Sequence, residues 1–393
     1  MRICRTAELE HGMILGKSLF NENGDLLLSS GFALTHQSIQ RINEYGFTAV
    51  YISEAGTENI LPEEIISDKV RCEATRKFSE AADTIQKATE FRKVKPSELR
   101  VIISRGAEFR NVVKMDDVFD QVSVMLNEVI ESSANMLNTL QIKSEKSYSR
   151  EHAIDTALVS ILIGRRLLLS RRELQELATG SFLHDVGKLA LPHLTDRPPQ
   201  SLSEEEILQI REHPVYSNLL MRNSTDRFFM AQTAVLYHHE RQDGLGYPLG
   251  VKGTGRKHRF GSVDPTKTIY PLAEIIAVAD AYDNHISGRY NGAAKSPEDA
   301  ISAVVSDVGT AFNHCVVKAL ADVISIFPTG SVVRILDSSL PKIRGYEAVI
   351  MSPNTDDYHR PVIVLLKDAL GRKITPKMID LSTEAFARLE LKL

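Results

Sequence analysis

The sequence contains little of what marks disulfide-stapled, cysteine-metal or nucleic-acid-binding proteins. Its three cysteines, Cys4, Cys72 and Cys315, lie far apart and form no C-x-x-C pair. A disulfide framework and a cysteine zinc site are therefore not expected, and reduced thiols are the plain interpretation. Lys and Arg total 47 against 51 Asp and Glu, and the net charge of −4 gives no argument for a nucleic-acid polymer as partner.

The sequence also lacks a long apolar run. The longest charge-free apolar stretch near the middle, Thr156–Gly164, is bounded by Asp155 and Arg165. A helix that crosses a membrane needs ~20 apolar residues, so no membrane span is expected. The first residues, MRICRTAELEHG, do not show the charged-then-apolar pattern of a signal peptide, and we expect a cytoplasmic protein.

What the sequence does contain is typical of a folded protein. Of its 393 residues, 43% are hydrophobic and 25% charged, which excludes disorder of the whole chain. At roughly 150 residues per domain, this length suggests about two or three domains. We expect a mainly α protein with a small α/β module in 1–62, a helical connector in 63–147, a central helical bundle in 148–327 and a β-rich C-terminal module in 328–393.

Local signals support each part. In the first module, Thr35 can cap a helix over Gln37–Tyr45 that Gly46 ends, and Leu26–Leu28 and Ala49–Ile52 are typical of short strands. In the central part, capping boxes and a proline at the first helical position mark helix starts at Ser170 with Glu173, Ser203 with Glu206, and Ser296 with Pro297. Three strands are expected near the C-terminus, over residues 331–336, 347–351 and 361–366.

The connector region is expected to hold two long helices. Glu63–Arg92 contains no Pro or Gly and is ended by Pro96, while Asp116–Leu140 carries an apolar stripe. Two interpretations stay open. These helices could pack against the core of their own chain, or the helix over Asp116–Leu140 could pair with the same helix of a second chain. A homodimer is therefore left open.

Histidine is concentrated in the central part, where eight of the twelve lie between residues 152 and 285. His152, His184, His213 and His238 follow one another at intervals of 32, 29 and 25 residues, which is one helix and one connection each time. Ligands on successive helices of a bundle can meet at one interior point. Imidazoles together with carboxylates suit first-row divalent metals, whereas calcium prefers oxygen ligands alone.

Taken one at a time, these residues have plainer explanations. A single histidine on an apolar helix is usually a hydrogen-bonded core residue, and His-Asp or His-His pairs also occur at solvated helix ends. Burying so many ionisable groups together is costly unless something compensates. The joint pattern therefore favours a metal cluster.

Two strings resemble a known family. His184-Asp185-Val186-Gly187-Lys188 resembles the H-D-x-G-K core of the HD phosphohydrolase superfamily, and HHERQDGLGYP, His238–Pro248, resembles the signature of its HD-GYP subfamily. The resemblance covers roughly 148–327. It implies a helical HD bundle and a bacterial, metal-dependent phosphodiesterase that hydrolyses the second messenger cyclic di-GMP to linear pGpG and, on further cleavage, to GMP.

The resemblance also implies roles for individual residues. The implied metal ligands are His152, His184, Asp185, His213, His238, His239 and Asp280. Asp185 would bridge two divalent ions, most plausibly iron or manganese, whose bridging hydroxide attacks the phosphorus. Asp185 and Lys188 would be the catalytic residues. The implied substrate contacts are Lys188, Gly246, Tyr247, Pro248 and Arg289.

Three features depart from the family. Members with a third metal carry a Glu where this chain has Tyr148, so two metals are expected. Arg289 is followed by Tyr290-Asn291-Gly292 without a second basic residue. The segment between His239 and Asp280 is long and contains basic residues, for which a solvated loop is favoured over a basic lid. Those basic residues are Arg256, Lys257, His258 and Arg259.

Two alternatives for the function stay open. The substrate could be another cyclic dinucleotide, such as a mixed GMP-AMP, because none of these motifs reads the base. The chain could also be a weakly active binding module that passes ligand occupancy to a signalling partner protein. His193 and His258 match nothing in the pattern and are assigned to the surface.

Overall fold

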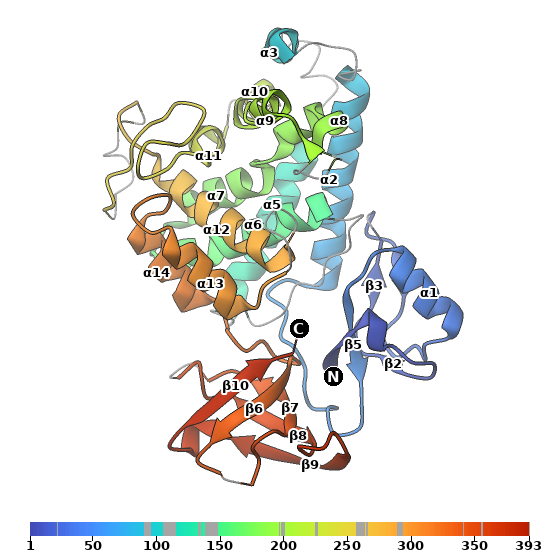
Figure 1. Cartoon of the computed structure of the whole chain (residues 1–393). Helices are drawn as coiled ribbons and strands as arrows, with labels where there is room; N and C mark the ends of the chain where they lie inside the picture. Colours follow the sequence, from blue (N-terminus) through green and yellow to red (C-terminus); the bar gives the residue numbers. More distant parts are fainter. Residues whose placement is uncertain are drawn as a thin grey trace.

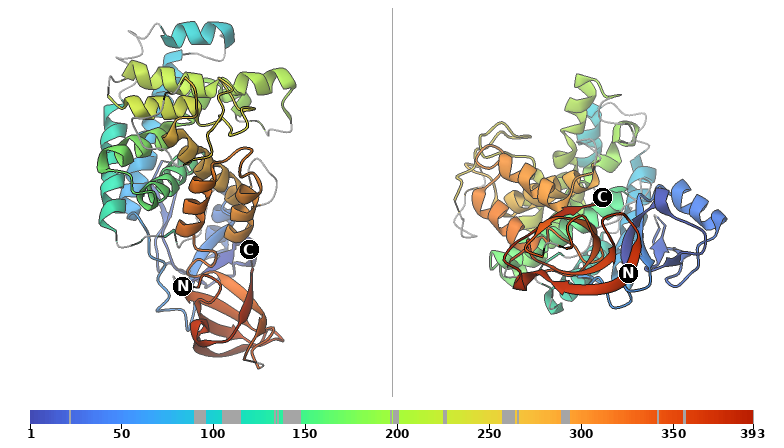
Figure 2. Two further views of the ribbon diagram at one scale, coloured as in Figure 1. Left: turned by 90° about the vertical axis from the view of Figure 1, so that its left-hand side faces the viewer. Right: turned by 60° about the horizontal axis from the view of Figure 1, so that its bottom comes forward.

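The computed structural model of the protein describes residues 1–393 except 22, 90–95, 105–114, 133, 135, 138–147, 196, 198–200, 225–226, 257–263, 265, 289–293, 341, 355–356 and 393. Within these residues a central helical bundle carries two small β-containing modules at one end (Figures 1 and 2). The mainly α fold class is confirmed. No helix of the described chain is long and apolar enough to cross a membrane.

The N-terminal module is a small α/β unit, as predicted. Its three-stranded sheet has the order β1-β5-β2, and a separate hairpin pairs β3 with β4. Thr35 caps helix α1 with a capping box, and Gly46 follows the helix with a φ of 79°. The elements are β1 Arg2–Arg5, η1 Thr6–Glu8, β2 Ile14–Leu15, β3 Leu19–Phe20, β4 Leu26–Leu28, α1 His36–Glu44 and β5 Ala49–Ser53.

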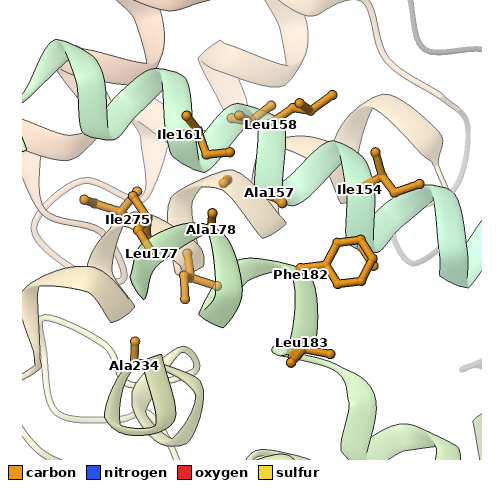
Figure 3. Packing of buried hydrophobic residues seen from close by; sticks show 14 of the residues in the cluster. Ile154, Ala157, Leu158, Ile161, Leu177, Ala178, Phe182, Leu183, Ala234 and Ile275 are labelled. Carbon is orange, nitrogen blue, oxygen red and sulfur yellow. The ribbon is translucent and has the colours of Figure 1, made fainter. Parts of the chain in front are cut away.

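The central bundle is built around helix α6, Tyr148–Arg166. Every residue from His152 to Gly164 is buried, so α6 has protein on all sides. Figure 3 shows Ile154, Ala157 and Leu158 of α6 beside side chains of α7 and α12. The other helices are α7 Arg171–Leu183, η3 Val186–Ala190, α8 Pro192–Thr195, α9 Glu204–Ile210, α10 His213–Ser224, α11 Phe229–Tyr237, α12 Pro271–Ser287, α13 Pro297–Ser306 and α14 His314–Val323.

The helix starts predicted in the bundle are confirmed. Ser170 and Ser203 each form a capping box with the glutamate three residues later. Ser296 caps α13, with Pro297 at its first position.

The helices before the bundle share its hydrophobic core. The core includes Phe78 of α2, Asp68–Thr89, and Val122 of α5, Asp116–Glu131, and the Phe78 ring meets Phe182 of α7 edge-on at 5.6 Å. A third helix, α3, spans Pro96–Ser104. How the chain divides into domains stays a prediction.

The expectation that one helix spans Asp116–Leu140 is wrong at its C-terminal end. α5 ends at Glu131, and Ser132 is already extended with a ψ of 135°. Ser and Asn form helices poorly because their side chains compete for backbone hydrogen bonds. Leu137 instead forms an isolated bridge with Ile324, and 138–140 lie outside the described residues.

The C-terminal module is an antiparallel sheet of order β10-β6-β7-β8-β9. The three predicted strands correspond to β6, β7 and β8, whereas the last two strands were not predicted. Against this sheet lies the N-terminal module: Ile3 N donates to Gly330 O at 2.8 Å, and Ile60 packs with Val349 and Val364. The bounds are β6 Val332–Ser338, β7 Glu347–Ser352, β8 Val362–Lys367, β9 Lys373–Asp380, η5 Leu381–Thr383 and β10 Ala387–Leu391.

A buried carboxylate anchors the segment that follows α11. Glu274 of α12 accepts hydrogen bonds from Gln242 Nε2 at 2.6 Å and Asn313 Nδ2 at 3.0 Å. The same two amides hold the next segment, because Gln242 Oε1 accepts from Gly255 N and Asn313 Nδ2 donates to Arg256 O. Burial raises the pKa of Glu274 to about 7, although the hydrogen bonds from the two amides act to lower it.

Glu274→Gln should change how stability depends on pH. The folded chain binds the Glu274 proton more tightly than the unfolded chain, so this proton stabilises at low pH and its contribution is lost as pH rises to about 7. Relative to wild type, E274Q should gain about 2–3 kcal/mol of unfolding free energy between pH 5 and pH 8. Urea denaturation with chelator present measures this difference. If the unfolding free energies of wild type and E274Q change with pH in parallel, the prediction is contradicted. The control is Glu205→Gln at an exposed position.

Candidate metal centre

Five separate elements deliver the predicted ligands to one place. His152 lies in the first turns of α6, and Asp280 lies in α12. The remaining ligands stand at helix ends, where the chain changes direction. His184 and Asp185 follow α7, His213 begins α10, and His238 and His239 follow α11.

The ligand atoms form two groups that share one carboxylate. Asp185 belongs both to a group with His152 and His184 and to a group with the three remaining histidines, His213, His238 and His239, and within each group the atoms lie within 4.8 Å of one another. Its Oδ1 lies 3.1 Å from His213 Nε2, and its Oδ2 lies 3.5 Å from His184 Nε2. A carboxylate with one oxygen in each group is placed to bridge two cations.

Asp280 lies against the two histidines of the first group. Its Oδ1 lies 3.1 Å from His152 Nε2 and 3.8 Å from His184 Nε2. The same oxygen accepts a hydrogen bond from Asn284 Nδ2 at 2.7 Å, one turn later on α12. The structure thus gathers all seven predicted ligands.

A second set of contacts fixes the orientation of four imidazoles. Each Nδ1 lies 2.6–2.7 Å from an oxygen, so that Nε2 faces the shared centre. For three histidines this oxygen is the carbonyl three residues earlier, and for His152 it is the carboxylate of Asp283. The pairs are His184 with Ser181 O, His213 with Ile210 O, His238 with Val235 O, and His152 with Asp283 Oδ2. Metal-binding histidines are commonly held this way.

The electrostatics keep three histidines neutral. Burial, then repulsion from His239 and His184, holds the pKa of His238 well below its usual range. Burial and His213 lower the pKa of His239 to about 3, and burial likewise lowers the pKa of His213. Neutral imidazoles with free Nε2 lone pairs are ready to bind a cation.

The carboxylates attract positive charge at the same point. Burial alone would raise the pKa of Asp185, but Lys188, His184 and His213 outweigh it and hold that pKa well below its usual range. Burial would lower the pKa of His152, but Asp280 and Asp283 raise it to about 10. Lys188 Nζ lies 2.5 Å from Asp185 Oδ2. Without a metal, a proton and an ammonium supply the cations that these carboxylates require.

The residues fit a metal cluster. Among the described residues, His152 Nε2, His184 Nε2 and Asp185 Oδ1 are buried without a hydrogen-bond partner, which is costly unless another group meets them. Nitrogen and carboxylate oxygen donors suit first-row divalent ions. These His and Asp groups could therefore hold metal ions.

The G-Y-P loop lies against the second group. Tyr247 stacks on His239, with ring centroids 4.7 Å apart and an interplanar angle of 27°. A Cβ at Gly246 would lie 2.5 Å from His239 O, so this close approach needs glycine. Pro248 follows Tyr247 through a cis peptide bond. Arg289 lies outside the described residues, as do the side chain of His193 and all of His258.

Sequence reasoning missed two supporting carboxylates. Asp283 orients His152, and Glu240 accepts backbone hydrogen bonds from residues 249, 250 and 251, just after the G-Y-P loop. Both are buried acids within a few residues of predicted ligands, and that proximity was the available signal. Tyr148 was noted in the sequence only because other members with a third metal carry a Glu at this position. In the structure its ring stacks on His152, with ring centroids 5.5 Å apart.

Comparisons with known proteins agree with the motifs. The HD domain family model matches residues 142–314. The cyclic di-GMP phosphodiesterase PA4108 of Pseudomonas aeruginosa is 24% identical over 311 residues, covering 78% of this chain and 72% of that protein. The HD domain match over residues 142–314 and these named relatives support an HD domain of the HD-GYP type in the central part of the chain.

Two further relatives align over shorter spans. The cyclic di-GMP phosphodiesterase response regulator RpfG of Xanthomonas campestris is 32% identical, covering 41% of this chain and 40% of that protein. The 3'3'-cGAMP-specific phosphodiesterase 3 of Vibrio cholerae is 26% identical, covering 48% and 38%. This chain therefore spans less than half the length of either. The solved structure of Bd1817, a HDG"Y"P protein from Bdellovibrio bacteriovorus, gives a TM-score of 0.39 at 16% identity, covering 81% of this chain and 98% of that one.

Gly187→Ala should disrupt the centre through the backbone. A Cβ at Gly187 would lie 2.2 Å from His213 O and 2.6 Å from Ser217 N, so η3 must move away from α10. Because Asp185 and His213 belong to these two segments, G187A should lower the metal retained after dialysis by about tenfold or more, the size of effect seen when the supports of metal ligands are lost. Elemental analysis and thermal unfolding measure the change.

The matched control is Gly180→Ala. A Cβ there meets its neighbours at ordinary contact distance, 3.4 Å, inside helix α7. G180A should keep its metal and its stability. If G187A behaves like G180A in both measurements, the close approach of η3 to α10 is not required.

Asp283→Asn tests the orientation of His152. The amide keeps the shape of the carboxylate but loses the charge that faces His152 Nδ1. Metal affinity should fall about 10–100-fold, because ligand-orienting carboxylates contribute by this amount. Competition with a chromogenic chelator measures it, with exposed Asp83→Asn as the control. An unchanged affinity would show that Asp283 does not support the ligand.

Proposed function

We propose that this chain is a metal-dependent phosphodiesterase that linearises cyclic di-GMP to pGpG and, on further cleavage, yields GMP. The observation that supports this most strongly is the sharing of Asp185 between two groups of buried and half-buried ligands. Two cations held on one bridging group can clamp the phosphate oxygens and support the cut of a phosphodiester. The assignment of His152, His184, Asp185, His213, His238, His239 and Asp280 as ligands is part of this proposal.

The chemistry follows from the ligand set. Two divalent cations, iron or manganese, supply when bound an activated water as nucleophile and positive charge for the phosphate oxygens. Asp185 would hold both cations. Lys188, whose Nζ lies 2.5 Å from Asp185, adds positive charge where the transition state becomes more negative. Tyr247 borders the site on the side of His239, on whose ring it stacks, and Pro248 follows it.

The relatives support the substrate class. PA4108 and RpfG are named as cyclic di-GMP phosphodiesterases, and a third relative as specific for 3'3'-cGAMP. The mixed nucleotide is therefore the second candidate substrate. Side-by-side turnover of the two nucleotides separates these candidates. A homodimer and a signalling partner stay predictions.

A cation count of two is part of the proposal. Tyr148 occupies the turn of α6 just before His152, stacks on that ring and is buried. Its hydroxyl donates to Asn284 Oδ1 at 2.9 Å, and Asn284 donates in turn to Asp280. The Tyr148 ring fills this position and is linked through Asn284 to the predicted ligand Asp280. The position therefore offers no carboxylate to a third cation.

The decisive experiment combines metal content with product analysis. Protein purified without oxygen should contain two metals per chain and convert cyclic di-GMP to pGpG or GMP. The double variant His184→Ala with Asp185→Ala should lose at least about 10³-fold of kcat/KM, because it removes two ligands including the shared one. His359→Ala, an exposed imidazole of the C-terminal module, is the control.

Three results would contradict the proposal. Three metals per chain would refute the count of two. Full turnover by the double variant, or no turnover of any cyclic dinucleotide by metal-loaded wild type, would refute the assignment of the site.

A further inference from the structure

One exposed arginine beside the candidate metal centre has no counter-charge among the described residues. Arg211 caps α9 two residues before His213, and its side chain forms no ion pair with any described residue. Its neighbours differ, since Arg197 pairs with Glu206 at 2.5 Å and Arg241 with Asp243 at 2.9 Å. A cation left uncompensated at the rim of a site is available to an anionic ligand.

The position of Arg211 relative to the site is defined by stacked groups. Its guanidinium carbon lies 5.5 Å from the centroid of the Tyr247 ring, and Tyr247 stacks in turn on His239. Arg211, Tyr247 and His239 thus form a series from the exposed rim to the candidate centre. Burial raises the pKa of the Tyr247 phenol, and Lys188 and Arg211 are the cations that act against this.

We propose that Arg211 holds the second phosphodiester of the cyclic dinucleotide, the one that is not cut. This inference rests on the proposed function. The substrate carries two phosphodiesters, and the cations at Asp185 can neutralise the one that reacts. The other enters with its charge unmet. Lys188 is engaged with Asp185, whereas Arg211 faces solvent beside Tyr247.

The chemistry of arginine suits this role. A guanidinium is always charged, and its planar fork pairs with two phosphate oxygens at once. Its approach to the Tyr247 ring restricts the side chain before the ligand arrives, which reduces the entropy lost on binding. After Arg289, which lies outside the described residues, the sequence Tyr290-Asn291-Gly292 offers no second basic side chain for the same purpose.

Arg211→Gln tests the proposal with two substrates. Cyclic di-GMP has two phosphodiesters, whereas bis-p-nitrophenyl phosphate has one, which must occupy the reacting position. R211Q should raise KM for cyclic di-GMP by about tenfold with little change in kcat, since a contact to the non-reacting phosphate is equal in ground and transition states. The ratio of kcat/KM for the two substrates should fall by the same factor. R211K keeps the charge but not the planar fork of the guanidinium. Its KM for cyclic di-GMP should therefore lie between those of R211Q and wild type.

A second readout does not depend on turnover. Equilibrium dialysis of labelled cyclic di-GMP against chelator-treated protein should show a weaker Kd for R211Q by the same factor. Arg222→Gln removes an exposed charge near the other end of α10 and should leave Kd and KM unchanged. Equal losses on both substrates, or an unchanged KM and Kd, would overturn the proposal.

These failures are distinguishable from failure of the proposed function. If wild type cleaves bis-p-nitrophenyl phosphate but no cyclic dinucleotide, the proposed function falls and the inference falls with it. If wild type cleaves cyclic di-GMP and R211Q does so with the same KM, the inference alone falls.

Discussion

The structure depends on one arrangement of charge, the sharing of Asp185 between two clusters of imidazoles, of which all but the half-buried His239 are buried. Seven ionisable side chains lie together in a helical core, where each would be unfavourable alone. They can lie together because three of the histidines are held neutral, whereas the carboxylates stay negative and attract cations. Burial lowers the pKa of His213, His238 and His239, while the carboxylates draw cations to the point between them.

The rest of the bundle holds this arrangement in position. Three of the histidines stand at helix ends, where the carbonyl three residues earlier has no helical partner and can accept from Nδ1. Helix termini thus satisfy their own backbone and orient the imidazoles with the same hydrogen bonds. α6 supplies rigidity, because a helix buried on all sides cannot rotate to turn His152 away from the site.

The sequence alone predicted which side chains gather at the candidate centre but not the residues that support them. The H-D-x-G-K and HHERQDGLGYP strings, and histidines spaced one helix apart, predict which side chains meet. Asp283 and Glu240 were not predicted, because their proximity to predicted ligands does not by itself distinguish a buried acid from a solvated one. The strands β9 and β10 were missed because both contain only exposed and half-buried residues, which weakens the apolar pattern.

Metal binding and folding are coupled in such a site. The predicted ligands come from five elements that meet only in the folded chain, so cations bound by the two groups would stabilise the folded state and not the unfolded one. Without a cation, the carboxylates are met by the His152 proton and by Lys188. A divalent ion must displace that proton before it can use Nε2 of His152. The same acids that attract the metal therefore make its binding dependent on pH, and a lower pH favours the proton.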